Sequence, residues 1–350
     1  MAGIQTCDRL EILNQEVIIA GGGLAGLSLA SGLRRKGVPV TVLEAGNYPR
    51  HRVCGEFISG VSQETLGNLG ITELFSDALR LRSLRWFSEG KLIHENQLAD
   101  AAMGISRYRL DERLRQHLEA EDVSVRTHIR SRPEPRDGFV WAAGRRPVSG
   151  KWLGLKAHVR NLPRSADLEM HSGRNGYAGL AEVEDGWTNV CGLFQVDRSI
   201  RANGADLLPA YLEAGGNRGL SRFLREAEWR EGSFSAVAGF EFGRQIPVPN
   251  LLTLGDAESM IPPFTGNGMS MAFQAAECAI GPLVDWSMGK QSWPESANLV
   301  RVLLARKFRV RLMTAEVVHP FLFKAGGKSL IKALSGAKIF PFQQMLALVR

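Results

Sequence analysis

Residues 16–45 read EVIIAGGGLAGLSLASGLRRKGVPVTVLEA, and this stretch decides the fold. A short apolar run leads into Gly21, Gly23 and Gly26 at the spacing G-x-G-x-x-G, and a helix-compatible segment and a second apolar run follow. Gly21 permits a tight strand-to-helix turn, Gly23 lets a pyrophosphate approach the backbone, and Gly26 lets the helix lie close to the strand. Glu44 ends the second run, where a carboxylate can accept hydrogen bonds from an adenosine ribose. The pattern predicts a bound dinucleotide with its phosphates at the helix N-terminus.

The composition bounds the class of protein. The chain has 350 residues, 44% of them hydrophobic, which is enough for two domains and too apolar for a disordered protein. No secretory signal and no run of roughly 18 uncharged apolar residues is present, so we expect no membrane span. The seven histidines show no metal-ligand spacing, and the cysteines lie far apart, at Cys7, Cys54, Cys191 and Cys278. We expect a reducing, cytoplasmic setting, without a disulfide framework or a metal site.

Positive charge is concentrated near the C-terminal end. Residues 301–350 carry ten Lys or Arg against one acid, Glu316, a net charge of +9, whereas residues 1–300 carry −2. Leu, Phe and Val are interleaved with these charges, so one expectation is peripheral contact with acidic lipid headgroups or with an acidic carrier protein. The other expectation is a helix packed on the main body with its charged face in solvent. Nucleic acid is not expected as a partner, because no binding motif for it is present.

The nucleotide-binding pieces are split around a β-rich middle. Leu110, Leu114 and Leu118 at i+4 spacing predict a helix over 109–121, and residues 204–227 also look helical. Residues 153–195 read as several strands separated by Gly, Asn and Asp turns. We expect an α/β fold with three parts: a Rossmann-like domain (12–58, 101–148 and 244–290), a β-sheet substrate domain (59–100 and 149–243) and a helical C-terminal segment (291–350) with Leu304, Phe308 and Leu312 on one face.

A second informative stretch is LLTLGDAESMIPPFTGNGMSMAFQAAECA, residues 251–279. Asp256 follows a buried strand and Gly255, which puts its carboxylate at the carboxyl end of the sheet, where ligands bind. There it can hold the hydroxyls of a sugar or ribityl chain. Residues 266–268, Gly-Asn-Gly, then open a helix over 267–288, so that the backbone can approach a flat ring. The positive end of that helix would stabilise the negative charge of a reduced isoalloxazine.

With these segments the chain resembles the FAD-dependent oxidoreductases of the para-hydroxybenzoate-hydroxylase fold, and within them the geranylgeranyl-reductase-like branch. Two further segments carry the resemblance, Arg52-Val53-Cys54-Gly55-Glu56 and Arg107-Tyr108-Arg109-Leu110-Asp111. It implies that FAD is the cofactor, with its phosphates near Arg107, its ribityl chain on Asp256, and the Cys-Gly loop on the substrate side of the flavin. The cofactor-binding residues that it implies are Gly21, Gly23, Ala25, Gly26, Glu44, Arg52, Cys54, Arg107, Gly255, Asp256, Pro263, Gly266, Asn267, Gly268 and Met269.

Two departures from the family pattern bear on the reaction. Hydroxylases of this fold carry an Asp-Gly pair where this chain has Ala142-Ala143-Gly144-Arg145, without a carboxylate. NAD(P)H or another electron donor therefore has no dedicated site in the sequence. The reductases carry an aromatic Y-x-W-x-F-P segment along the prenyl cavity, whereas residues 176–180 here read Gly-Tyr-Ala-Gly-Leu. That difference weakens a literal polyprenyl assignment.

Three residues are candidates for catalysis: Cys54, Glu56 and Tyr177. A thiol beside the flavin, or Glu56 with a raised pKa, could give a proton to a substrate carbon. The alternatives are that Cys54 fills space and that Glu56 caps the helix after it. Tyr177 is either a donor or an amphipathic cavity wall. His51 is expected to face solvent, and the second-domain aromatics Trp86, Phe87, Phe240 and Phe242 are expected either in the core or around an apolar cavity.

The expected function is that of an FAD-dependent oxidoreductase acting on a lipophilic small molecule or a carrier-bound chain. The favoured reaction is reduction of a carbon–carbon double bond by hydride transfer from flavin N5. The first alternative is a flavin-dependent monooxygenase acting on a polyketide or aromatic substrate, since the two share nearly every motif. The second is a non-catalytic flavin-binding partner protein.

Overall fold

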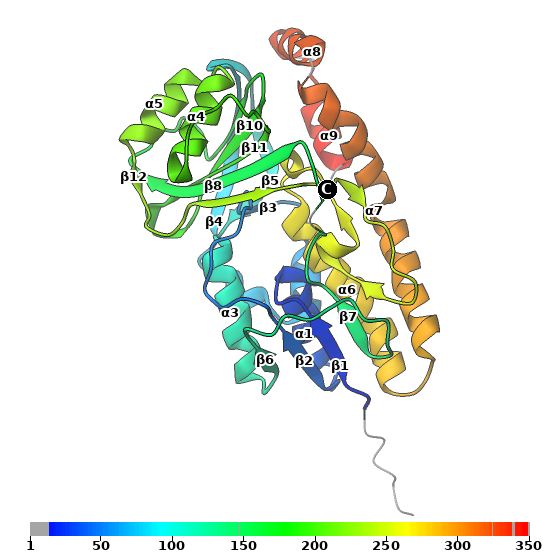
Figure 1. Ribbon diagram of the computed structural model, residues 1–350. Coiled ribbons are helices and arrows are strands. Elements are labelled where there is room, and N and C mark those ends of the chain that lie inside the picture. Colours follow the sequence, from blue (N-terminus) through cyan, green and yellow to red (C-terminus); the bar gives the residue numbers. More distant parts are fainter. Residues whose placement is uncertain (1–13, 147, 324, 338–339, 349–350) are drawn as a thin grey trace, which may run out of the picture.

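The computed structural model describes residues 14–146, 148–323, 325–337 and 340–348, and Cys7 lies outside them. Within these residues the chain forms a parallel sheet with helices around it, a larger mainly antiparallel sheet, and a C-terminal run of helices (Figure 1). The predicted fold class is thereby confirmed: a Rossmann-like domain split in sequence, a second β-sheet domain and a helical C-terminal segment.

The parallel sheet has the strand order β15-β7-β1-β2-β6. Its strands are β1 (Val17–Ala20), β2 (Val40–Leu43), β6 (Ser124–Arg126), β7 (Phe139–Trp141) and β15 (Leu252–Thr253). Strand β1 is central and pairs in parallel with both β2 and β7. Three helices share one hydrophobic core with the sheet: α1 (Leu24–Arg34), α3 (Arg107–Ala120) and α6 (Gly268–Ser287). Segments more than 200 residues apart in sequence thus meet at the carboxyl edge of one sheet.

The second sheet runs in the order β12-β8-β11-β10-β9-β4-β5-β3, and β13 also pairs with β8. The strands from the first half are β3 (Phe57–Ile58), β4 (Leu79–Ser88) and β5 (Lys91–Gly104). The predicted strands over 153–195 are confirmed as β8 (Trp152–Arg160), β9 (Leu168–Ser172), β10 (Gly176–Glu182) and β11 (Thr188–Gln195), with β12 (Glu228–Trp229) and β13 (Ser235–Ala238) beyond them. Most pairs are antiparallel, and β4 joins β9 in parallel.

Helices α4 (Leu207–Ala214) and α5 (Arg218–Glu226) cover the outer face of the second sheet (Figure 1). The helical character predicted for 204–227 is confirmed, and the chain divides it into two helices at Gly215-Gly216. Gly216 has φ +97°, a left-handed conformation that interrupts a helix. The short helix α2 (Gln63–Leu69) and the turn that follows it pack in the core of the parallel sheet, through Leu66, Leu69 and Phe75.

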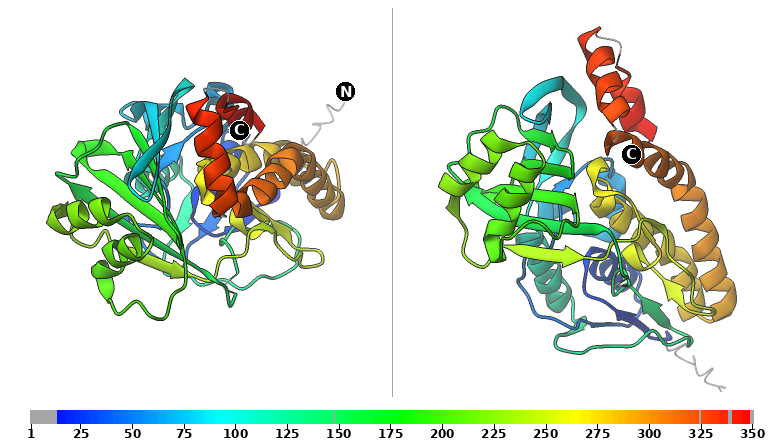
Figure 2. Two further views of the ribbon diagram at one scale, coloured as in Figure 1. Left: turned by 90° about the horizontal axis from the view of Figure 1, so that it is seen from above. Right: turned by 45° about the horizontal axis from the view of Figure 1, so that its top comes forward.

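The C-terminal segment contains α7 (Trp293–Phe323), α8 (Ala325–Gly336) and α9 (Phe342–Leu348). The prediction of an apolar face on α7 is confirmed, since Leu304, Phe308 and Leu312 are all buried. Figure 2 shows α7 as a long edge on the side of the molecule opposite α4 and α5. A two-stranded pair, β14 (Gly243–Arg244) with β16 (Ser259–Met260), completes the elements. Across the described residues, no helix combines the length and the hydrophobicity that crossing a bilayer requires.

Candidate active site

In the turn between β1 and α1, each glycine is required for a different reason. Gly21 has φ +117°, and a Cβ there would overlap the carbonyl group of Ala142. A Cβ on Gly26 would overlap the carbonyl oxygen of Gly21, so α1 can approach β1 only without a side chain. At Gly23 a Cβ would meet open space, with Nη2 of Arg107 at 4.0 Å as its nearest neighbour. The turn therefore leaves a vacant approach to the N-terminus of α1, where unpaired N–H groups attract an anion.

Two arginines border this approach, and one buried carboxylate holds both. Asp111 is fully buried and accepts hydrogen bonds from Nε of Arg107 at 2.7 Å and from Nε of Arg52 at 3.0 Å. Arg52 also reaches the carbonyl oxygen of Gly22 at 3.4 Å. The two guanidinium groups are thus fixed beside the glycine turn, as a diphosphate requires. Asp111 was not predicted as a site residue, although its i+4 spacing from Arg107 on a helix was a visible signal.

Glu44 lies at the carboxyl end of β2, buried against the same turn. Its carboxylate accepts hydrogen bonds from the backbone N–H groups of Gly22 and Gly46, each at 2.8 Å, and from Arg50 at 2.7 Å. Burial alone would raise the pKa of Glu44, but the Gly46 N–H and the charge of Arg50 outweigh it and lower the pKa. Glu44 is therefore an ionised acceptor at neutral pH, at the place predicted for ribose contact.

The second motif, Gly255-Asp256, packs against the start of α1, next to the glycine turn. Gly255 has φ +63°, and a Cβ there would lie 2.9 Å from the Cβ of Ala25, so this approach also requires glycine. Asp256 follows at the carboxyl edge of the sheet. It is accessible to solvent yet surrounded by protein, and this burial raises its pKa although Arg107, Arg145 and Arg52 act in the opposite direction. The carboxylate therefore lies within the electrostatic reach of the phosphate-side arginines.

The N-terminus of α6 presents backbone instead of side chains. Gly266 has φ +66° and lies so close to Phe57 that a Cβ would overlap its ring. Asn267 and Met269 are buried, whereas a Cβ on Gly268 would meet no atom within 4 Å. The first turn of α6 therefore opens onto free space beside Gly268, and Pro263 stands at the wall of a neighbouring cavity. These features fit FAD: an anion site at α1, a carboxylate at Asp256 for hydroxyl groups, and a positive helix end for the ring.

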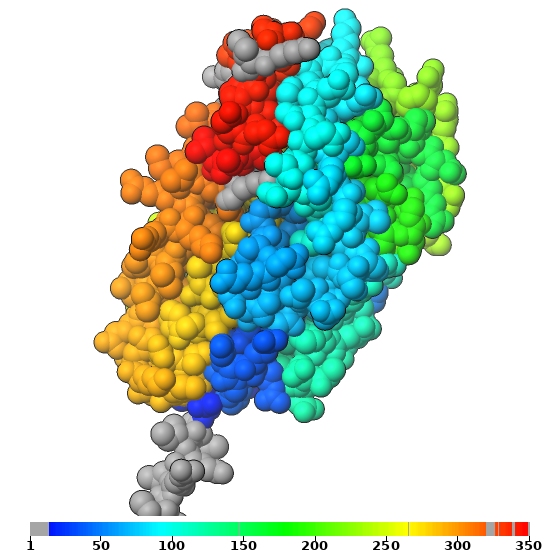
Figure 3. All heavy atoms as spheres, turned by 180° about the vertical axis from the view of Figure 1, so that it is seen from behind, coloured from blue at the N-terminus to red at the C-terminus, as the bar shows by residue number. Residues whose placement is uncertain are grey.

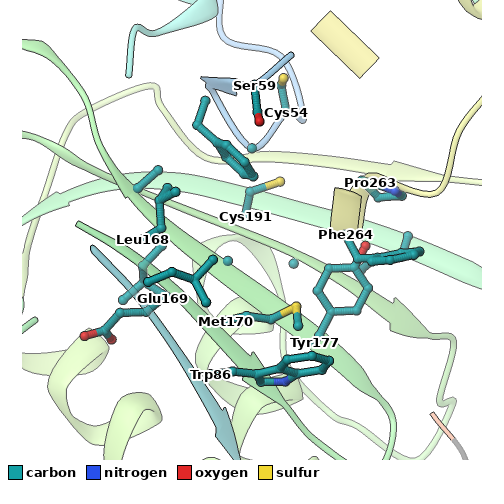
Figure 4. A pocket seen from close by; sticks show the side chains of 18 of the residues that line it. Cys54, Ser59, Trp86, Leu168, Glu169, Met170, Tyr177, Cys191, Pro263 and Phe264 are labelled. Atoms are coloured by element: carbon teal, nitrogen blue, oxygen red, sulfur yellow. The ribbon is translucent and has the colours of Figure 1, made fainter. Parts of the chain in front are cut away.

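A cavity of about 200 Å³ lies between the second sheet and this flavin-side backbone (Figure 4). Its wall is mainly aliphatic and aromatic, and it comes from β4, β9, β10, β11, the loop at 53–59 and the Pro263-Phe264 turn. The C-terminal segment closes another side with Val318, Phe342, Met345 and Leu346. No sequence signal had indicated this last contribution. The cavity is suited to a lipophilic molecule, because burying apolar surface there would need few polar partners.

Of the three predicted catalytic residues, Cys54 and Tyr177 line the cavity and Glu56 does not. The loop that carries Cys54 is fixed to β11, because Nδ2 of Asn189 donates to the carbonyl oxygen of Cys54 at 3.0 Å. Burial raises the pKa of both the Cys54 thiol and the Tyr177 phenol, so each keeps its proton at neutral pH. The Tyr177 hydroxyl interacts with the backbone of Phe264. Cys191, from β11, is a second thiol in the same wall.

Glu56 belongs to a buried ionic cluster on the far side of the loop. Its carboxylate binds Nζ of Lys156 at 3.1 Å, Nε2 of His158, and the backbone N–H of Arg107 at 2.9 Å. Burial alone would raise the pKa of Glu56, but Lys156 and His158 outweigh it and lower the pKa to about 2. The expected raised pKa was therefore wrong. So was the expected cap, since Ser62 caps α2 and Glu56 instead binds the first turn of α3.

His51 also differs from its expected place. Its ring stacks on Tyr108 at 4.5 Å, and Nδ1 lies 3.1 Å from Nζ of Lys156, so it is half-buried against the cluster and does not simply face solvent. Burial and the charge of Lys156 lower its pKa to about 3. Among the aromatics, Trp86 and Phe240 line the cavity.

The Ala142–Arg145 segment continues from β7 toward the second sheet. Arg145 donates to the carbonyl oxygens of Gly239 and Ala238, the latter at 2.8 Å, and its guanidinium lies 4.5 Å from the ring centre of Phe240. Where hydroxylases have a carboxylate, this chain therefore places a cation bound to the β13 end of the second sheet.

Comparison with known proteins agrees with this geometry. Residues 14–139 match a family described as the FAD binding domain. Menaquinone reductase of Mycobacterium tuberculosis H37Rv is 24% identical over 332 residues, with 80% of this chain and 78% of that protein covered. The menaquinone reductase of Mycolicibacterium smegmatis is 23% identical, with coverages of 84% and 82%.

Solved structures share the fold at lower identity. The flavin-dependent brominase Bmp2 has a TM-score of 0.76 at 15% identity, covering 96% of this chain and 93% of its own. PqsL, a probable FAD-dependent monooxygenase from Pseudomonas aeruginosa, has 0.70 at 15%, covering 90% and 98%. The p-nitrophenol 4-monooxygenase PnpA from Pseudomonas putida has 0.72 at 14%, covering 96% and 97%. FAD is the cofactor of this protein, which is an FAD-dependent oxidoreductase.

Proposed function

We propose that the protein reduces a carbon–carbon double bond of a lipophilic substrate held in the cavity between the second sheet and the flavin-side backbone. The observation that carries this proposal is the cavity itself. Its wall is almost wholly apolar, yet it includes Cys54 and Pro263, which belong to the two loops assigned to the flavin ring. A substrate in it would be shielded from water and would lie against the redox end of the cofactor.

The positions of the residues suggest a separate role for each in binding FAD and in protonating the substrate. Gly23, Arg52 and Arg107 would hold the phosphates of FAD, Asp256 would hold its hydroxylated chain, and the α6 N-terminus would stabilise negative charge on its ring. When bound and reduced, FAD supplies the electron pair and one hydrogen for the reduction. The second hydrogen arrives as a proton, and the Cys54 thiol is the protonated group placed to hold it, since the pKa of Cys54 is raised by burial.

The relatives support the proposal of a reductase over that of a monooxygenase. Two menaquinone reductases align over most of this chain, and menaquinone is itself lipophilic and rich in double bonds. The absence of a carboxylate at Ala142-Ala143 also separates the chain from the hydroxylase pattern. We therefore propose an isoprenoid or a similarly apolar chain as the substrate class.

A flavin-dependent monooxygenase is the second candidate. It is favoured by the names of the solved structures with this fold, which include two monooxygenases. Likeness at 14–15% identity supports the fold and does not discriminate between the reactions.

The two proposals separate when the protein is reduced anaerobically with dithionite and then mixed with an isoprenoid acceptor or with air. The decisive acceptor is an isoprenoid alkene without a quinone ring, because the ring of menaquinone can take the electron pair itself. A reductase recovers its oxidised flavin absorbance on adding this alkene without oxygen, and Cys54→Ala slows this recovery while FAD content is kept. A monooxygenase stays reduced with the alkene and reacts quickly with oxygen when an aromatic substrate is bound. Failure of such isoprenoid alkenes to reoxidise the flavin would contradict the reductase proposal. Loss of the oxidised flavin absorbance on adding NADPH, without dithionite, would identify NADPH as an electron donor.

A further inference from the structure

A stripe of exposed apolar side chains runs along α7. Its members are 41%, 53%, 58%, 56% and 76% exposed, in the order Leu299, Val302, Val310, Met313 and Val317. At 100° per residue these five positions fall within a sector of about 80° on the helix surface. We call them the α7 stripe. The opposite face of α7 is buried, so the stripe is what the helix leaves uncovered after packing on the core.

Basic side chains accompany the stripe. Arg306 falls inside the same sector and Arg309 at its edge, and both are exposed. Within the described part of the chain, neither arginine takes part in an ion pair, whereas Lys307 on the adjoining face lies 3.8 Å from Glu277. Over its whole length α7 carries five Lys or Arg and two acids. The surface therefore combines an apolar strip with an excess of positive charge, the pairing that favours an interfacial position on anionic lipid.

The C-terminal end of the stripe adjoins a cavity-lining residue in sequence. The stripe ends at Val317, and the next residue, Val318, lines the cavity wall. In the view from behind, the side chains of α7 and the helices after it form one outer edge of the molecule (Figure 3).

We propose that the α7 stripe docks on an anionic lipid bilayer, with α7 lying in the interface plane. This goes beyond the proposed reaction and does not depend on it. A second copy of the chain is a poorer occupant, because antiparallel pairing of two stripes about their middle would bring the two Arg306 side chains together. An acidic carrier protein would satisfy the charge, but a convex strip nearly 30 Å long is better matched to an extended surface.

Flotation of the full-length, FAD-loaded protein with vesicles tests the proposal. The vesicles are phosphatidylcholine alone, or phosphatidylcholine with roughly a third phosphatidylglycerol. Wild type is expected to float with the anionic vesicles and much less with the neutral ones. Val310→Asp combined with Val317→Asp should weaken binding at least tenfold. Each of Arg306→Gln and Arg309→Gln should weaken it about fivefold, and more salt should abolish that difference.

The matched control is Ile246→Asp, which places the same charge at a side chain that is 75% exposed and lies on a loop outside α7. It should bind vesicles as wild type does, and FAD content confirms that each variant is folded. The proposal is overturned if wild type does not float with anionic vesicles, or if Ile246→Asp loses binding as fully as the stripe variant. It is also overturned if the stripe variant converts a dimer to a monomer, or if only an acyl carrier protein binds.

Discussion

Replacing Gly23 with alanine should weaken FAD binding at least about tenfold while leaving the folded protein intact. The residue precedes α1 with φ −90° and ψ −176°, which alanine adopts without strain, and a Cβ would meet open space apart from Arg107 at 4.0 Å. The free energy of unfolding without FAD should therefore change by less than about 1 kcal/mol. The new methyl group would stand where the phosphates approach the helix N-terminus.

The loss of affinity follows from the contacts that would be blocked. A hydrogen bond from a backbone N–H to a charged phosphate contributes roughly 1.5–3 kcal/mol. Losing one of them should weaken FAD binding about 10-fold to 150-fold, at 1.4 kcal/mol per factor of ten. The measurements are fluorescence titration of the apoprotein with FAD, and urea unfolding of the same sample.

Gly26→Ala is the matched control, since its Cβ would overlap the Gly21 carbonyl oxygen inside the helix–strand contact. It should lower the unfolding free energy of the apoprotein by about 1–3 kcal/mol or more. Wild-type FAD affinity in Gly23→Ala, or an equal loss of stability in the two variants, would refute the assignment of Gly23 to the phosphate approach.

Three further outcomes are expected. Asp111→Asn leaves Arg52 and Arg107 without their shared carboxylate, and it should lower the free energy of unfolding in urea by roughly 3–5 kcal/mol. The control Arg115→Gln breaks a more exposed ion pair and should cost at most about 1 kcal/mol. Similar losses in the two variants would contradict the role of Asp111 as the buried partner of both arginines. Since the pKa of Glu56 is lowered from 4.5 to about 2 on folding, its ionisation stabilises the protein above pH 4.5, and this is lost as the pH falls toward 2. The unfolding free energy of Glu56→Gln should therefore vary less over that range, and an unchanged pH profile would contradict the cluster. Gly179→Leu fills the cavity wall at a position where a Cβ meets only ordinary contacts. It should therefore slow flavin reoxidation by an isoprenoid alkene about tenfold or more at unchanged FAD content, and an unchanged rate would place the substrate elsewhere.

The sequence predicted the parts of the site that depend on local backbone conformation. Gly21, Gly26 and Gly255 each occupy a position where a side chain would clash or the backbone is left-handed. Because only glycine meets these requirements, its spacing in the sequence predicts the local backbone. The alternation and turn residues between 153 and 195 likewise predicted the strands of the second sheet.

What the sequence did not predict depends on contacts between distant segments. Neither alternative for Glu56, a raised pKa or a helix cap, anticipated its ionic cluster. Its partners Lys156 and His158 lie about 100 positions away, and no spacing rule connects them. The contribution of Phe342 and Met345 to the cavity wall was not predicted for the same reason, because the sequence of a short terminal helix does not indicate which surface it covers.

The mass of the product made from menaquinone by the dithionite-reduced protein tests the central claim most directly. After the quinone ring of the anaerobic product has been returned to its oxidised form, a double-bond reductase leaves a product heavier than menaquinone by one pair of hydrogen atoms. Fragmentation places that pair in the isoprenoid chain, and Gly179→Leu forms less of this product. A product that appears only in air and is heavier by one oxygen atom would contradict the account.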